Sequence, residues 1–538
     1  MFTSNKLSSF YTDSSRHTKM STLIFIWLMN NLIKKGQTIA IMLFVMAGAI
    51  NTSAQTTVPI DEEHFPDEGF RNYVNAHATP DNISSITRFT IDDEKSEYNI
   101  KDLQGIEYFT SLTGLAIYSC NITNTNLSNI PNLRSLVVYN CPELISLSMT
   151  GHSQIAGIGI DHCKNLSVAH LSNNPNLGTL SIQQNSNLQQ IELEGNVALK
   201  EIKLWQPKDA LMTTCDFSML PNLEYLSFNN LQGLNLSGNT NLKHLDTTDS
   251  PNLLGIDISN NVNLEAVWFF GTKNLPSLDV RSNTRLKDLR INSHQLTSLD
   301  VSNNTNLEFL LVMNAPITSL DVSANQKLTS LFLDSLQLTE INLSNNDKLK
   351  EFRCIRNNIT ALDFSNNPAL TSIDCNGNQL TSLDLSYNPE LKTLNCSNNL
   401  LTSLDLQHNT NIQDALIFMN HIKENAMTML INSLPLAYSN FCVLFPEGDE
   451  GNVFTYNHYQ LVKSKRWTPY YMEWIWFPYR ERYDYAKREI TDKFWEGTHI
   501  QTIGTDKQTS PIYNLNGQRL AYPSVKTPYI QNGRIHIK

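Results

Sequence analysis

Cysteine is the residue type with the clearest chemical potential in this chain of 538 residues. Cys354, Cys375 and Cys396 follow one another at intervals of 21 residues, a spacing open to three interpretations: a disulfide framework, a metal ladder or a column of packed side chains. The sequence contains no C-x-x-C pair, which weakens a zinc site because structural zinc sites usually take two ligands from such a pair. The choice among the three depends on what else recurs at this spacing.

Signals for catalysis are poor. The segment GHSQI at 151–155 begins like the G-x-S-x-G nucleophile elbow, but Ile155 stands where the second glycine is required. His152 shares a column with Asn174 and Asn196 at steps of 22, so we interpret it as a bend residue rather than a base. The sequence has no H-E-x-x-H, no P-loop and no dinucleotide fingerprint. We predict a non-enzymatic protein with no catalytic residues, metal or cofactor.

Aspartate also recurs in one column, which could bind cations or serve only structure and solubility. Carboxylates stacked about 4.8 Å apart repel one another. The fold can tolerate such a column if each carboxylate stays hydrated and accepts hydrogen bonds from the local backbone or from serine. We interpret the column as structural and keep a cation stripe as the alternative. Its members are Asp257, Asp279, Asp300, Asp321, Asn342, Asp363, Asp384 and Asp405.

The period that spaces the cysteines extends over most of the chain. The cysteine column continues through apolar residues at 269, 291, 312, 333 and 417. An asparagine column runs beside it at steps of 22, 22 and then 21: Asn239, Asn261, Asn283, Asn304, Asn325, Asn346, Asn367, Asn388 and Asn409. Such self-similarity is typical of a solenoid, in which each turn buries its apolar face only against its neighbours.

The turns follow the pattern L-x-x-L-x-L-x-x-N, and residues 111–420 resemble leucine-rich repeats, in particular the internalin-like repeats of 21–22 residues. Strand alternation in LTSLDL directs the leucines inward, and asparagine at the bend can bond the backbone. The resemblance implies a β-rich solenoid coiled as a flattened, right-handed parallel coil. Each turn has two similar halves, which predicts two extended faces.

Within this coil the cysteine slot is an apolar core position. Stacked cysteines would have parallel Cβ bonds, and three in a row leave one unpaired, so we interpret the thiols as reduced core residues, with a disulfide or metal as the alternative. A second set, Cys120, Cys141 and Cys163, falls at the bend position ahead of Asn185 and is predicted to replace the bend asparagine.

The N-terminal region predicts export. Lys34 and Lys35 precede an apolar run at 38–50 and the small residues TSA at 52–54, the order typical of a secretory signal cleaved near Ala54. The run is too short to span a membrane. We predict a signal peptide at 29–54, with 1–28 as an untranslated stretch or a leader extension, and a secreted or cell-surface location without an integral membrane span.

Both ends of the solenoid are predicted to carry caps. Residues 55–110 contain a helical stretch at 61–77 that resembles the N-terminal caps of secreted bacterial leucine-rich-repeat proteins. Residues 421–500 form a mixed cap with helices in 425–435 and 455–467 and strands in 441–445 and 468–472. Residues 501–538, with YNLNGQRL and IQNGRIHIK, resemble the C-terminal sorting tails of exported Bacteroidetes proteins, although Thr527 and Pro528 replace the usual Lys-Gly. A small β-hairpin module is the structural alternative.

Recognition is predicted on the sheet face whose outward residues vary from turn to turn. Its middle is apolar, as in the core of a protein interface, and the predicted partner-binding residues are Trp268, Phe270, Phe309, Leu311, Met313 and Phe332. The resemblance implies an adhesion protein whose partner is a host matrix or cell-surface protein, and we predict that it is a monomer. Three alternatives remain for this surface: it captures glycans on its aromatic rings, the protein is a passive spacer, or the apolar residues are not exposed. The last would hold if the C-terminal cap covered them or if the strand register were shifted by one residue. The net charge of −11 argues against a nucleic-acid partner.

Overall fold

The computed structural model describes residues 57–247, 249–444, 451–477 and 482–491, together with five short strands between residues 502 and 536. The predicted signal peptide at 29–54, with its cleavage point near Ala54, lies outside the described residues and stays a prediction. The chain divides into two compact units, Met1–Leu275 and Pro276–Lys538.

The cap of the first unit contains α2 (Glu68–His77), which is shorter than the helical stretch predicted at 61–77 because residues 61–67 form turns. The Asp67 side chain accepts a hydrogen bond from the amide of Phe70 (2.7 Å), which satisfies one of the free donors of the first turn. The helix buries Phe70, Tyr73 and Val74. The helical N-terminal cap is thus confirmed.

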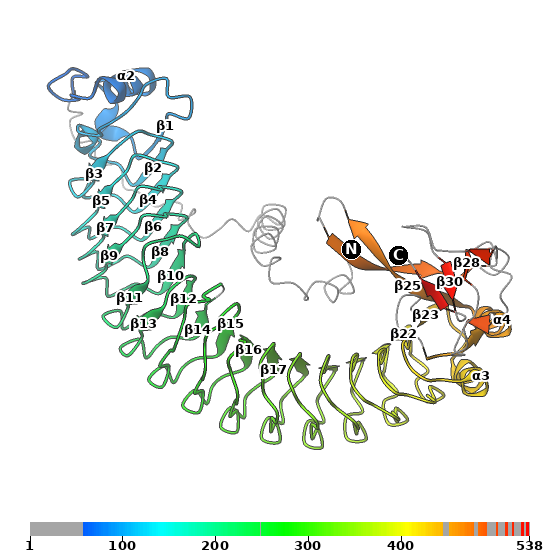
Figure 1. Ribbon diagram of the computed structural model, residues 1–538. Helices are drawn as coiled ribbons and strands as arrows, with labels where there is room; N and C mark the ends of the chain where they lie inside the picture. Colours follow the sequence, from blue (N-terminus) through cyan, green and yellow to red (C-terminus); the bar gives the residue numbers. More distant parts are fainter. Residues whose placement is uncertain are drawn as a thin grey trace. The chain divides into compact units, whose positions relative to one another are not determined.

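The main sheet of the first unit is built by one strand per turn, paired in parallel with the next (Figure 1). Alternation is clear in the burial of these strands: Leu115 and Ile117 are buried, while Gly114, Ala116 and Tyr118 are half-buried. The strands are β1 (Arg88–Asp92), β2 (Gly114–Tyr118), β4 (Ser135–Tyr139), β6 (Gly157–Asp161), β8 (Thr179–Gln183), β10 (Glu201–Trp205), β12 (Tyr225–Phe228), β14 (His244–Asp246) and β15 (Ala266–Phe269).

The second unit continues the same plan with seven parallel strands, each again contributed by one turn. They are β16 (Asp288–Asn292), β17 (Phe309–Met313), β18 (Ser330–Asp334), β19 (Glu351–Arg353), β20 (Ser372–Asp374), β21 (Thr393–Asn395) and β22 (Asp414–Leu416). Both units therefore confirm the solenoid predicted from the period.

The C-terminal cap extends this second sheet. Strand β22 pairs with β23 (Ser439–Leu444), β23 pairs with β25 (Trp467–Phe477), and β26 (Arg482–Glu489) closes the series antiparallel to β25. Two helices, α3 (Glu424–Ser433) and α4 (Tyr456–Ser464), complete a mixed cap as predicted. Closing the sheet in this way covers an edge that would otherwise be open to pairing with another chain.

The C-terminal tail carries a separate small antiparallel sheet. Its strands are β28 (Ile512–Asn514), β29 (Arg519–Leu520), β30 (Tyr529–Gln531) and β31 (Arg534–His536), while β27 (Thr502–Ile503) pairs with β24 (Phe454–Thr455). A hairpin-like β module is consistent with the structural alternative for this tail.

The second extended face of each turn is formed only in part. In the first unit β3 (Asn124–Asn126), β5 (Ser146–Ser148), β7 (Val168–His170) and β9 (Gln190–Glu192) form a parallel ladder, and β11 (Thr214–Asp216) pairs with β13 (Gly233–Asn235). Among residues 276–423 the matching segments carry no strand. There the amides that follow the aspartate bond within their own turn, as Ser302 N donates to Asp300 Oδ1 and Asn304 N to Val301 O.

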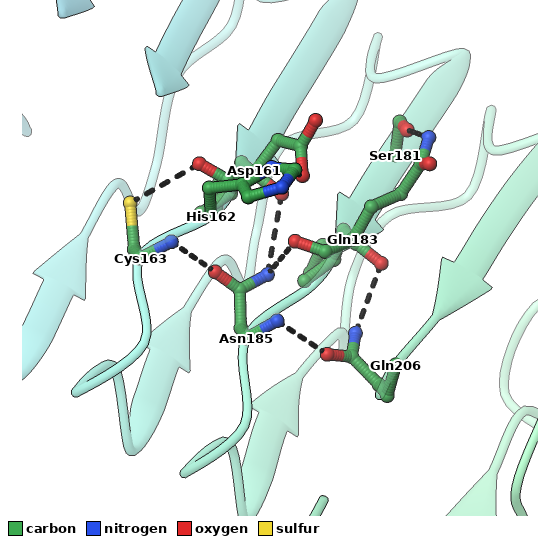
Figure 2. Close-up of polar contacts among 9 residues, drawn as sticks. Asp161, His162, Cys163, Ser181, Gln183, Asn185 and Gln206 are labelled. Carbon is green, nitrogen blue, oxygen red and sulfur yellow. Dashed lines mark hydrogen bonds and ion pairs between the residues drawn. The ribbon is translucent and has the colours of Figure 1, made fainter. Parts of the chain in front are cut away.

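The bends are held by side chains that replace missing backbone bonds (Figure 2). Asn185 Oδ1 accepts from Cys163 N (2.9 Å), and Asn185 N in turn donates to Gln206 Oε1 (2.8 Å). The amide group of Asn185 also donates to the carbonyls of Ile160 and Gln183. One side chain therefore links two turns, which confirms the predicted role of the bend residue.

The two sets of cysteines occupy the positions predicted from the period. Cys163 lies in the bend column, where its Sγ lies 3.6 Å from the carbonyl oxygen of Asp161. Cys354, Cys375 and Cys396 are free and fully buried in the core. Burial raises the pKa of the Cys396 thiol to about 12, so this side chain stays protonated and acts as a small apolar group.

Candidate binding surface on the main sheet

The candidate surface is the outward side of the main sheet, and its geometry follows from strand alternation. In β17, Leu310 and Val312 are fully buried in the core, and Phe309, Leu311 and Met313 take the outward positions. The predicted in/out register is therefore correct for this strand.

An aromatic pair marks this surface in the second unit. The rings of Phe309 and Phe332 meet edge to face with centroids 5.2 Å apart, and both side chains are half-buried. The Arg290 guanidinium lies 4.4 Å from the centre of the Phe309 ring and makes two bonds to Asp288 (2.8 and 2.7 Å). Such edge-to-face and cation–π contacts fix ring orientation.

The other two residues predicted in this patch are covered. Leu311 and Met313 point outward but are only 7% and 5% exposed. Cross-strand register places Leu311 beside Phe332 and Met313 beside Asp334. The accessible apolar area is thus made by the two phenylalanine rings, and Leu311 lies beside one of them, Phe332.

A separate aromatic group lies in the first unit. Trp268 and Phe270, two of the predicted partner-binding residues, are half-buried there. His244 stacks on Tyr225 (4.6 Å between centroids, 8° between planes) and meets Trp268 edge to face at 4.4 Å. The stack gives this group flat aromatic surfaces of defined orientation.

Trp205 was missed by the sequence analysis. Its indole Nε1 donates to Ser227 Oγ (2.7 Å), and Ser227 Oγ donates to Asp246 Oδ2 (3.1 Å). This chain of bonds fixes the indole on the same outward side of β10, β12 and β14. A tryptophan at the last outward position of the variable segment EIKLW was the available signal.

A row of charged residues borders the phenylalanine pair in the second unit. Asp334, only 4% exposed, makes a 2.6 Å ion pair with Arg353. Asp374 is the register neighbour of Arg353 on the next strand and accepts a bond from Asn376 N (3.2 Å). Burial raises the pKa of Asp374 to about 6, and the nearby Arg353 only partly opposes this shift.

His152 is a bend residue. Its amide donates to Asn174 Oδ1 (2.9 Å), and its Nε2 lies 2.9 Å from the carbonyl oxygen of Leu127. Burial lowers the pKa of this imidazole, and Gly151 before it has a positive φ of 75°, which suits a bend and not a strand-to-helix elbow. The interpretation as a structural residue is confirmed by these contacts.

The aspartate column bonds locally, as expected for its structural interpretation. The carboxylates of Asp300, Asp321 and Asp384 each accept the amide of the serine two residues on, at 2.8–3.0 Å. Hydrogen bonds from the serine side chain and the serine amide lower the pKa of each carboxyl group, with the side chain the larger cause at Asp300. Within the described residues, no group of three or more His, Cys, Asp or Glu side chains is placed to hold a metal ion.

The column predicts loss of stability in acid. Hydrogen bonds to Arg281 hold the pKa of Asp279 at about 2, below the value of about 3.9 for an unfolded chain. A lowered pKa stabilises the folded state above pH 4, and that contribution disappears as the pH falls towards 2. We expect the thermal midpoint to drop across this window, and the drop to be smaller in Asp279→Asn. Circular dichroism measures the thermal midpoint of both proteins. An equal drop in the two would mean that groups other than Asp279 cause the acid sensitivity.

Comparisons with known proteins agree with this architecture. A family model described as the At1g61320/AtMIF1 leucine-rich-repeat domain matches residues 83–245. No curated protein matches the chain. The match covers less than a third of the chain, and together with the repeat period and the observed coil it agrees with a leucine-rich-repeat fold.

Several solved structures are similar in fold. The functional domain of InlJ from Listeria monocytogenes, which includes a cysteine ladder, is 24% identical, with 82% of this chain and 95% of that chain covered and a TM-score of 0.47. The internalin InlF of the same species is 20% identical (73% and 98% covered, TM-score 0.36), and YopM from Yersinia enterocolitica is 18% identical (73% and 82% covered, TM-score 0.44). Similarity at this level does not transfer a function.

No helix in the described part of the chain combines the length and the apolar character needed to cross a membrane.

Proposed function

We propose that this leucine-rich-repeat chain is an exported, non-enzymatic protein that binds another protein through the outward side of its main sheet, in adhesion at the cell surface or after secretion. The observation that carries the proposal is the half-buried pair Phe309 and Phe332, flanked by the charged groups of Arg290 and Arg353. Aromatic rings with charged neighbours are enriched where protein interfaces concentrate their binding energy.

Export and sorting rest on the ends of the sequence. The basic and apolar segments before Ala54 support secretion, and the tail at 501–538 supports sorting to the surface of a Bacteroidetes-type bacterium. A rigid sheet face suits adhesion because little conformational freedom is lost on binding.

Selection of random peptides displayed on phage tests the binding proposal without a known partner. We expect peptides that bind the immobilised protein, and we expect Phe309→Ala and Phe332→Ala each to weaken them at least tenfold, since a buried aromatic anchor contributes about 2 kcal/mol. Asp384→Asn, outside the main sheet, is the matched control. Failure to recover any peptide that depends on Phe332 would contradict binding through this face.

Glycan capture is the rival because the first unit offers the stacked rings of Tyr225, His244 and Trp268. A glycan array distinguishes the two. Sugar binding predicts that Trp268→Ala abolishes the array signal while Phe309→Ala and Leu311→Ala leave it intact. Protein binding predicts no array signal and a loss of peptide capture in Phe309→Ala.

A further inference from the structure

One straight row of side chains crosses the outward side of the second sheet. Parallel register makes neighbours of Arg290 and Leu311, of Leu311 and Phe332, of Phe332 and Arg353, and of Arg353 and Asp374. Strands lie about 4.8 Å apart, so Asp374 lies about 10 Å from Phe332 along this row. An apolar position and an acidic position are therefore held at a fixed separation on one surface.

The charges at the acidic end do not balance. Arg353 turns towards Asp334 on the preceding strand, and its ion pair with that carboxylate measures 2.6 Å. Asp374 on the other side keeps only the amide of Asn376 and a contact with the Asn395 side chain. Two carboxylates thus share one guanidinium.

The neighbouring charged groups compensate Asp334 better than Asp374. Burial raises the pKa of Asp334, and both Arg353 and Arg356 oppose this shift, whereas at Asp374 Arg353 is the one cation that does so. Glu351 on the same strand as Arg353 is exposed, and its Oε2 accepts from Ser330 Oγ (3.4 Å). Asp374 is therefore the carboxylate whose charge is least compensated.

Hydrogen bonding is also incomplete here. Asp334 Oδ1 and Arg353 Nε are buried and lack a hydrogen-bond partner within the structure. Both atoms lie below the surface, so a partner's cation would act on the carboxylates through its charge and would not satisfy either atom by a hydrogen bond. The raised pKa of Asp374 agrees with this, because burial disfavours its charged form and the nearby Arg353 offsets that effect only in part.

We infer that the row from Phe332 to Asp374 is a two-point recognition site for a basic protein segment, in which an apolar side chain of the partner packs on Phe309 and Phe332 and a lysine or arginine about 10 Å away pairs with Asp374. The inference rests on the proposed function and specifies the chemistry of its partner. Phe332 provides the apolar contact and Asp374 the selectivity for a cation.

Peptides selected on phage against the immobilised protein test this chemistry. Those that depend on Phe332 should be enriched in lysine or arginine near an aromatic or aliphatic residue. For such a peptide, Asp374→Asn should weaken binding about tenfold, the effect of losing one close charge pair. The same peptide with norleucine in place of its lysine should bind wild type and Asp374→Asn equally.

The outcomes separate the two proposals. Peptides that depend on Phe332 but carry no excess of basic residues, or that bind Asp374→Asn as well as wild type, overturn this inference and leave binding through the sheet face intact. Absence of any Phe332-dependent peptide overturns both. Asp384→Asn controls for the loss of one negative charge, and the thermal midpoint of each variant confirms that it is folded.

Discussion

Leu383→Asp is expected to lower the free energy of unfolding by about 3–5 kcal/mol. Leu383 is an inward residue of LTSLDL and is buried. A carboxylate at that position would lose most of its hydration with no cationic partner in the core, and the leucine contacts would be lost as well. Urea or thermal denaturation of the two proteins measures the difference.

The neighbouring Asp384→Asn is the matched control because it changes one side chain in the same segment that points outward. Asp384 Oδ1 accepts from Ser386 N (2.9 Å), and an amide oxygen can accept the same bond. Asn342 already does so in an earlier turn, where it accepts from Ser344 N at 3.0 Å. We expect a change within about 0.5 kcal/mol. If Leu383→Asp leaves the transition as unmoved as this control, residue 383 does not face the core.

The core could be predicted because repetition determines it. Every residue of the cysteine column, from Phe269 to Ile417, is fully buried, since each occupies the same place in successive turns and the turn before it dictates its environment. The identity of the residue adds little, which explains why cysteine, leucine, valine and phenylalanine alternate in one slot.

Exposure on the outward side could not be predicted in the same way. Alternation determines which side of the sheet a side chain faces, and the predicted outward direction was correct for Leu311 and Met313. Accessibility depends instead on the size of the side chains on the neighbouring strand, here Phe332 and Asp334. Because these outward positions vary between turns, no repeat pattern specifies how far one covers the next.

Trp205 was not predicted as part of the outward surface because the repeat period is irregular around it. Glu201 pairs with Tyr225, 24 residues on, and Tyr225 pairs with His244, only 19 residues on. A search at 21–22 residues loses phase between these turns. The bond from Trp205 to Ser227 joins strands whose alignment only the structure supplies.

Asn185→Leu is expected to lower the free energy of unfolding by about 3 kcal/mol or more, although the two side chains are similar in size. The change removes the acceptor of Cys163 N and the donor to the Ile160 and Gln183 carbonyls. Each buried backbone group left without a partner costs about 1–3 kcal/mol. Denaturation followed by circular dichroism measures the loss.

Two companion variants show whether the loss comes from the bend position. Asn187→Leu, at an exposed side chain whose amide lies 3.3 Å from Asn165 Oδ1, should change stability by less than about 0.5 kcal/mol. Asn185→Cys should fall between, because Cys163 already occupies this slot one turn earlier with only weak thiol contacts, to Asp161 O of its own turn and to Cys141 of the turn before. Equal stability of Asn185→Leu and Asn187→Leu would mean that backbone pairing alone holds the turns, and the side-chain ladder would then have no part in cohesion of the solenoid.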